Sequence, residues 1–199
     1  MNIKVLGGTI ALVGLYFILT SSTTRKKYKF LFIGDSNTDN KNSYADKLKL
    51  KFPDSKFDKV AKWGEKTKWM LENLENHLKT NKNYDFIALL GGSNDVYGGI
   101  PLEQTKSNIL KIRDLIKKDG AKSILISPPN KKFFPENDKE KNQKLQDLID
   151  WEKKQDFDFF IDFHDLTDKV DLFMSDLRHP NQQAHQILAD LYQKTTGIG

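Results

Sequence analysis

The sequence predicts an α/β protein whose parallel sheet is covered by helices on both faces. Five short segments are almost continuously apolar, segments with helical spacing of apolar residues separate them, and short polar motifs follow the strand-like segments. Parallel strands that are buried on both faces read as continuous apolar runs, whereas half-exposed strands alternate. The regular alternation of strands and helices favours one layered domain.

The five expected strands are short apolar runs bounded by turn-forming residues. The first ends at Gly34, the third precedes Gly91-Gly92, and the fourth is closed by Pro128-Pro129. The expected strands are residues 28–33, 57–61, 86–90, 123–126 and 159–163.

The expected helices carry apolar residues three or four positions apart, as a single buried helix face requires. Met70, Leu74 and Leu78, for example, share one face, and Asn181 is a suitable N-cap for the last helix. The expected helices are residues 44–51, 66–78, 105–118, 136–154 and 182–192. The side chains expected on the buried faces of the last two are Leu145, Leu148, Ile149, Trp151, Ile187, Leu188 and Leu191.

The chain divides into an N-terminal leader, residues 1–27, and one folded domain, residues 28–199, a size typical of a single domain. The formal net charge is +5, but five of the 32 basic residues precede the first acidic residue, Asp35. That leaves 27 basic residues against 27 acidic ones, so the chain from Phe30 onward is formally neutral. A nucleic-acid-binding domain carries a basic face, so we expect no nucleic-acid partner.

The leader contains 16 uncharged, mostly apolar residues, 5–20, which would span about 24 Å as a helix. One interpretation is a secretory signal cleaved near residues 21–24. The other, which we favour, is an uncleaved membrane anchor through residues 3–24, held to anionic lipid by Arg25, Lys26 and Lys27. The positive-inside rule favours a cytoplasmic domain, whereas the expected substrates favour an exterior one, so the topology stays open.

A candidate nucleophile, Ser36, follows the first expected strand in the tripeptide Gly34-Asp35-Ser36. A serine hydroxyl needs a neighbouring base to become nucleophilic. On its own the tripeptide is more typical of a turn than of a catalytic site, because Gly, Asp and Ser are turn formers. The chain has no cysteine, which excludes disulfides, cysteine-bound zinc and a thiol nucleophile.

The candidate base is His179, which follows Asp176 by three residues just before the last helix. At that spacing the Asp176 carboxylate can reach one imidazole nitrogen and leave the other free for Ser36. A surface Asp–His pair is the alternative reading. His164 and His185 are rival histidines, but a metal site at Asp162, His164 and Asp165 lacks convincing ligand spacing, so we expect neither metal nor cofactor.

Acyl transfer also requires hydrogen-bond donors for the oxyanion of the tetrahedral intermediate. Asn94 lies in Gly92-Ser93-Asn94-Asp95 after the third expected strand, and Gly64 follows the second. The Asn94 amide and the Gly64 N–H are candidates to join the Ser36 N–H in an oxyanion hole. All these motifs fall at carboxyl ends of expected strands, where ligands bind in open parallel sheets.

Together these motifs resemble those of the SGNH/GDSL hydrolase superfamily over residues 28–195. The GDS of residues 34–36, Gly64, the GSND of residues 92–95 and the DLRHPN of residues 176–181 stand in the family's order. The resemblance implies a flavodoxin-like three-layer α/β/α sandwich and metal-free ester or thioester hydrolysis through an acyl-enzyme. It implies Ser36 as nucleophile, His179 as base, Asp176 as third triad member, and Gly64 and Asn94 as oxyanion donors. Asn37 departs from the family's leucine, and Trp63-Gly64-Glu65 is a sparse match.

For the substrate we expect an acetylated carbohydrate or cell-envelope glycan, cleaved by an O-acetylesterase held at a membrane. The short loop 97–101 and the absence of a visible inserted lid favour a small acyl group on an accessible polar substrate. A lysophospholipase or acyl-thioesterase is the alternative, and a catalytically silent membrane-tethered binding module is the second alternative. Either a sugar or an acyl chain would suit the aromatic residues expected near the site, Trp63, Trp69, Tyr97, Phe133 and Phe134.

Overall fold

A computed structural model describes residues 26–134 and 138–199. The predicted leader lies almost entirely outside the described residues, so the anchor and signal interpretations stay predictions. No helix in the described part of the chain is long and apolar enough to span a bilayer.

The core element is a five-stranded sheet in which every pair of neighbouring strands is parallel, in the order β2-β1-β3-β4-β5. The strands are β1 Lys29–Gly34, β2 Lys56–Ala61, β3 Phe86–Leu90, β4 Lys122–Ile126 and β5 Phe159–Ile161. The first strand, β1, is next to the edge strand β2, and the chain then crosses back over β1 to β3, β4 and β5 in order. All five predicted strands are therefore confirmed, with ends that differ from the prediction by at most two residues.

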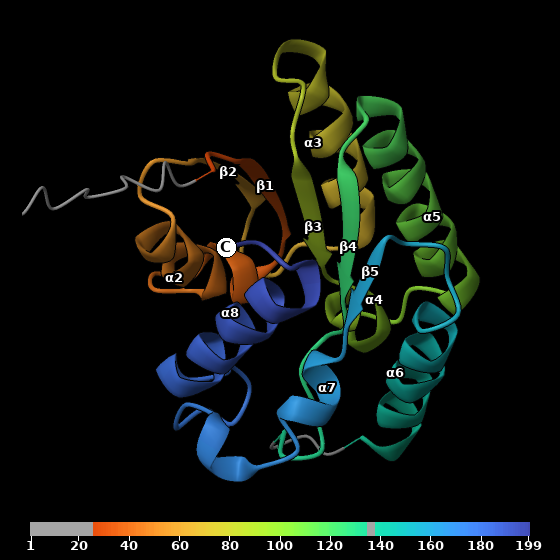
Figure 1. Cartoon of the computed structure of the whole chain (residues 1–199). Helices are drawn as coiled ribbons and strands as arrows, with labels where there is room; N and C mark the ends of the chain where they lie inside the picture. Colours follow the sequence, from red (N-terminus) through yellow and green to blue (C-terminus); the bar gives the residue numbers. More distant parts are fainter. Residues whose placement is uncertain (1–25, 135–137) are drawn as a thin grey trace, which may run out of the picture.

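Helices cover both faces of this sheet (Figure 1). The longer ones are α2 Tyr44–Lys51, α3 Thr67–Thr80, α5 Leu102–Asp119, α6 Lys139–Glu152 and α8 Gln182–Thr196. The shorter ones are α1 Ser36–Asp39, α4 Ser93–Tyr97, α7 Phe163–Leu166 and a 3-10 turn, Val170–Leu172.

Alternate residues of the buried strands lie in two different hydrophobic cores, one on each face of the sheet. Phe30 and Phe32 of β1 lie in the core shared with α2 and α8, whereas Leu31 and Ile33 lie in the core shared with α3, α5 and α6. Figure 1 shows the same division, with α2 and α8 on one side and α3, α5 and α6 on the other. The predicted three-layer α/β/α sandwich is confirmed.

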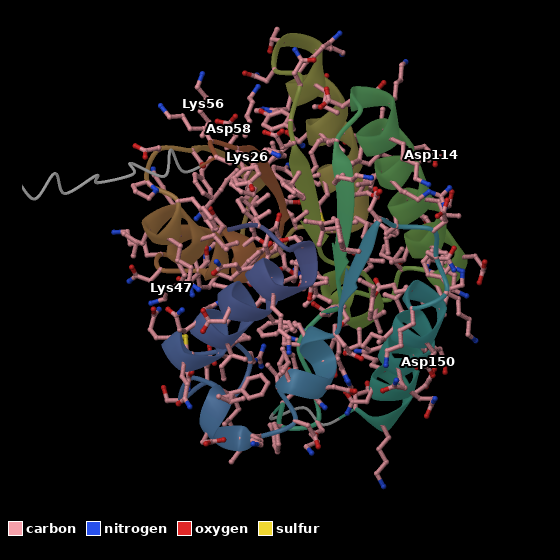
Figure 2. The ribbon with its side chains drawn as sticks, viewed as in Figure 1. Lys26, Lys47, Lys56, Asp58, Asp114 and Asp150 are labelled. Carbon is pink, nitrogen blue, oxygen red and sulfur yellow. The ribbon has the colours of Figure 1, made fainter. Side chains whose placement is uncertain are left out.

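The surface of this sandwich carries charges of both signs. Figure 2 shows Lys56, Asp114 and Asp150 pointing away from the sheet, and all three are exposed.

Several predicted boundaries and burials are wrong in detail. The fifth strand ends at Ile161 because the Asp162 side chain caps α7, accepting a hydrogen bond from the Asp165 N–H. Asp138 caps α6 in the same way, accepting from the Lys141 N–H, so that helix begins at Lys139; the predicted start at residue 136 lies outside the described residues. Partly buried side chains at the edges of the cores, rather than fully buried ones, are Trp151, Ile187 and Leu191.

Candidate active site

The candidate site lies at the carboxyl ends of β1 and β3, where the short helices α1 and α4 begin. Gly34 allows α1 to turn tightly against β3. A methyl group on Gly34 would meet the Leu90 carbonyl oxygen at 2.7 Å and would also collide with the Thr38 hydroxyl. Only glycine fits this position without a backbone shift, and the next two residues are thereby set at the end of the sheet.

Ser36 is the first residue of α1 and is 7% exposed. Asp35 caps the helix, since its Oδ1 accepts hydrogen bonds of 2.9 Å from both the backbone N–H and the side-chain amide of Asn37. Burial raises the pKa of Asp35, and the Asn37 N–H and the Lys131 ammonium oppose that rise. The Asn37 amide nitrogen thus has a polar partner, whereas its buried Oδ1 has none among the described residues.

The predicted Asp–His pair is present in the loop before α8. His179 Nδ1 lies 2.6 Å from Asp176 Oδ2, and the backbone N–H groups of Arg178 and His179 donate to Asp176 Oδ1 at 2.9 and 3.1 Å. Burial raises the pKa of Asp176, but these hydrogen bonds outweigh it and hold the pKa below its ordinary value. Because an ionised carboxylate only accepts, Nδ1 donates and Nε2 is left as the basic nitrogen.

The loop that makes this pair bends sharply. Leu177 has φ of +54°, a left-handed conformation that costs a leucine roughly 1–2 kcal/mol. The bend is held by hydrogen bonds from Leu177 N to Met174 O and from Met174 N to His179 O. Strained backbone of this kind is concentrated at functional sites.

All of the sequence-predicted site residues except Asp176 line one cavity of about 470 Å³. Ser36 and His179 come from opposite ends of the chain, Gly64 comes from the loop after β2, and Asn94 comes from α4, which follows β3. Asp176 does not line the cavity but is hydrogen-bonded to His179, which does. The fold therefore brings together four motifs that are separated by as much as 143 positions.

The three candidate oxyanion donors differ in how they are held. Among the described residues, no hydrogen bond uses the N–H of Ser36 or of Gly64, and Gly64 has φ of +73°. Asn94 Nδ2 donates to the Glu65 carbonyl at 3.0 Å and makes a longer contact of 3.4 Å with Asp35 Oδ2. The first bond ties the loop of Gly64 to α4.

Asp95, the last residue of the GSND motif, strengthens the same connection. Its buried carboxylate accepts hydrogen bonds from the Thr67 N–H at 3.0 Å and the Thr67 hydroxyl at 2.6 Å. Burial raises the pKa of Asp95, and the two Thr67 bonds oppose the rise. These contacts join the start of α3 to α4 and fix the position of the residue next to Asn94.

The aromatic residues suggested by the sequence separate into two groups. Trp63, Tyr97 and Phe134 line the cavity, and the Trp63 ring lies 5.0 Å from the His179 ring. Trp69 instead packs against a hydrophobic core, and Phe133 packs against Phe173.

Lys131 is a cavity residue that the sequence analysis missed. Its side chain is 6% exposed and lines the cavity with Ser36 and His179. Burial lowers its pKa to about 8, against the opposing effect of Asp35 and Asp176. Its place shortly after the end of β4 was the one available signal, since the other site motifs also follow strand ends.

The rival histidines lie outside the cavity. His185 is 1% exposed inside α8, and burial lowers its pKa to about 4. Next to His164, the Asp162 carboxylate pairs with Lys153 at 2.7 Å and caps α7. In residues 26–134 and 138–199, no group of three or more His, Asp or Glu side chains is arranged to hold a metal ion.

Known proteins with this fold include several esterases and lipases. The esterase EstA from Pseudoalteromonas is 18% identical, with a TM-score of 0.66 over 86% of this chain and 97% of that one. A member of the lipolytic protein G-D-S-L family from Veillonella parvula is 17% identical, with a TM-score of 0.67 over 83% and 96%. A lipase/acylhydrolase from Enterococcus faecalis is 20% identical, with a TM-score of 0.65 over 84% and 94%. These likenesses establish the fold.

Family membership rests on the sequence. No curated protein sequence shows significant similarity to the chain. The sequence profile of the GDSL-like lipase/acylhydrolase family, however, matches residues 32–187, from β1 into α8. The chain therefore belongs to the GDSL-like lipase/acylhydrolase family and is a carboxylic ester hydrolase of the SGNH type.

Proposed function

We propose that this hydrolase removes O-acetyl groups from a carbohydrate or cell-envelope glycan through an acyl-enzyme on Ser36. The observation that carries the proposal is the hydrogen bond from His179 Nδ1 to Asp176 Oδ2, on the wall of the cavity that Ser36 also lines. Such a pair leaves a basic imidazole nitrogen for a serine hydroxyl.

In the proposed reaction the Ser36 oxygen attacks the ester carbonyl carbon while its proton passes to His179 Nε2. The oxyanion is stabilised by the N–H groups of Ser36 and Gly64 and by the Asn94 amide. The Asn94 side-chain amide has two N–H hydrogens. To reach the oxyanion, the one in the long contact with Asp35 turns to the substrate, while the second keeps its bond to the Glu65 carbonyl. The C–O bond then breaks and the alcohol leaves with the proton from His179. Water, deprotonated by His179, hydrolyses the acyl-enzyme and restores Ser36.

A small acyl group on a polar substrate is supported by the cavity walls. The lining is mixed: Trp63, Tyr97 and Phe134 offer faces on which a sugar can stack, and Asn94, Lys131 and Lys141 offer donors. Polar groups placed among aromatic walls are typical of sites that orient a polar ligand.

A lysophospholipase or acyl-thioesterase is the second candidate, favoured by exposed apolar side chains in or near the loop of His179. Trp63 is 52% exposed, Met174 is 45% exposed and Val170 is 53% exposed. A long acyl chain would cover apolar surface of this kind, at roughly 25 cal/mol per Å².

We also propose that residues 3–24 hold the hydrolase at a membrane, with the basic residues 25–27 at the lipid surface. Both substrate candidates suit this location, since a membrane lies beside envelope glycans and contains lysophospholipids.

The proposed function is tested with the full chain, its Ser36→Ala variant, a p-nitrophenyl ester series from acetate to palmitate, and acetylated glycan. We expect acetate release from the glycan and from the short ester, lost in Ser36→Ala. Turnover of long-chain esters alone would favour the lysophospholipase or acyl-thioesterase alternative. A phosphonate should also block turnover, as in the Pseudoalteromonas esterase that was solved inhibited by monoethylphosphonate. No turnover of any ester by folded protein would favour a binding module.

A further inference from the structure

The cavity contains a buried cation that the triad chemistry does not use. Lys131 follows β4, and the loop that carries it is fixed by two bonds to the segment after α7, from Asn130 N to the Thr167 hydroxyl at 2.8 Å and from the Asn130 amide to Asp168 at 3.2 Å. Lysine is almost never this deeply buried without a paired charge. The position of the ammonium therefore requires an explanation.

The Lys131 ammonium has unused hydrogen-bonding capacity. Its Nζ donates to the Arg178 carbonyl at 3.3 Å, the only acceptor within hydrogen-bond distance in the described part of the chain. Asp35 and Asp176 act on it electrostatically, but no described carboxylate lies within the 4.0 Å of an ion pair. An ammonium has three N–H donors, so two remain for a ligand.

The remaining surroundings of this ammonium also favour an anion. The Phe134 ring lies 4.1 Å from Nζ and shields it from water, and Arg178 contributes a second positive charge nearby. The cavity lining contains three basic residues, Lys131, Lys141 and Arg178, and a single carboxylate, Asp35, whose oxygens already accept hydrogen bonds. Lys141 pairs with Asp138 at 3.5 Å, outside this lining. The pKa of about 8 leaves most of Lys131 protonated at pH 7.

We propose that Lys131 is a specificity residue that binds a negatively charged group, a phosphate or carboxylate, close to the scissile ester of the substrate. This inference rests on the proposed ester hydrolysis at Ser36 and narrows its substrate to an acylated compound that carries a negatively charged group near the ester. A charge-assisted hydrogen bond from a buried ammonium discriminates an anionic from a neutral ester by about 10- to 100-fold.

The test compares acetyl esters that carry a negative charge with matched neutral ones. The substrates are 2-, 3- and 4-acetoxybenzoate and their methyl esters, assayed at pH 7 with the full chain by release of the phenol. The three isomers place the carboxylate at three distances from the same acetyl ester. The readout is the ratio of kcat/KM for each anion to that for its neutral partner, which cancels any general loss of activity in a variant.

We expect the wild-type protein to prefer at least one anion by about 10-fold or more. Lys131→Met should bring that ratio to one or below, mainly through KM, and Lys131→Arg should restore it. Lys132→Met is the matched control, because Lys132 is the exposed neighbour, pairs with Asp168 and does not line this cavity. Its ratio should equal that of the wild type.

Two results would overturn the inference: a wild-type ratio of one or below for all three isomers, or an unchanged ratio in Lys131→Met. Failure of the proposed function itself looks different, because then no ester is cleaved. In that case thermal unfolding with benzoate and with benzamide gives the same comparison. Benzoate should stabilise the wild type more than it stabilises Lys131→Met, whereas benzamide should stabilise the two proteins equally. Equal stabilisation of the two proteins by benzoate would overturn the inference.

Discussion

His179 Nδ1 donates a 2.6 Å hydrogen bond to Asp176 Oδ2, and the backbone N–H of the same histidine donates to the other oxygen of that carboxylate at 3.1 Å. One side chain thus fixes both the ring and the backbone of His179. The ring is oriented with Nε2 as its basic nitrogen, as the proposed chemistry requires.

Asp176→Asn should lower kcat by about 10²- to 10⁴-fold with little loss of stability. The asparagine oxygen can still accept from the Arg178 and His179 N–H groups, but its NH₂ cannot accept from Nδ1 and favours the wrong tautomer. Single-turnover kinetics with p-nitrophenyl acetate and a thermal melt check both parts. Unchanged kcat would remove Asp176 from the catalytic set.

Gly34→Ala should cost about 1–3 kcal/mol of stability and most of the activity. The added methyl group meets the Leu90 carbonyl at 2.7 Å, so the backbone that carries Ser36 has to move. Gly120→Ala is the control, because it adds strain at φ +83° but meets nothing within 4 Å and lies at the end of α5, away from the cavity. Equal activity in the two variants would contradict the tight turn at Gly34.

His185 should make the fold lose stability in acid. Its pKa is about 4 in the folded protein, lowered by burial, against 6.5 without that burial, so below pH 6.5 the unfolded chain binds a proton that the folded one does not. Protonation of His185 therefore does not affect the free energy of unfolding above pH 6.5 and lowers it by about 3 kcal/mol on going down to pH 4. Urea unfolding of the wild type and His185→Leu at pH 7 and 4.5 tests this. Parallel losses in both would refute it.

Glu152→Gln should stabilise the protein at pH 8 by about 1–3 kcal/mol and far less at pH 4. Both carboxyl oxygens are buried without a hydrogen-bond partner among the described residues, and burial, together with the charge of Asp162, raises the pKa well above 4.5. The unfolded chain therefore releases a proton that the folded one retains, so stability falls as pH rises from 4.5.

A second residue of α6 provides the control for that comparison. Glu140 is 78% exposed and pairs with Lys144 on the surface, so Glu140→Gln should change stability by less than about 0.5 kcal/mol at either pH. Denaturant midpoints at both pH values separate the two variants. A Glu152→Gln protein as insensitive as Glu140→Gln would show that the buried carboxyl carries no penalty.

The sequence predicted the sheet well because burial on both faces leaves a strong local signal. Phe86–Leu90 is apolar at every position, and its bounds were predicted without error. The motif residues were found for a related reason, since Ser36 and Asn94 lie two and four positions after the ends of two such strands. The short helices α1 and α4 were missed because four or five residues carry no periodicity.

Lys131 could not be recognised in the same way. Its burial depends on the bonds between Asn130 and the Thr167–Asp168 segment, 37 or 38 positions away, and on the Phe134 ring above it. The bond from Asn94 to the Glu65 carbonyl is another long-range contact of this kind. Contacts that depend on the packing of distant loops leave no pattern within a window of the sequence.

The proposed chemistry requires Ser36 as the nucleophile. A covalent adduct can be located by mass spectrometry of the full chain after reaction with an ethyl p-nitrophenyl phosphonate. Ser93→Ala is the matched control, since Ser93 lines the same cavity at the start of α4. We expect one phosphonyl group per chain, mapped to Ser36, unchanged in Ser93→Ala and absent in Ser36→Ala. An adduct on Ser93, or none on folded wild-type protein, would contradict the account.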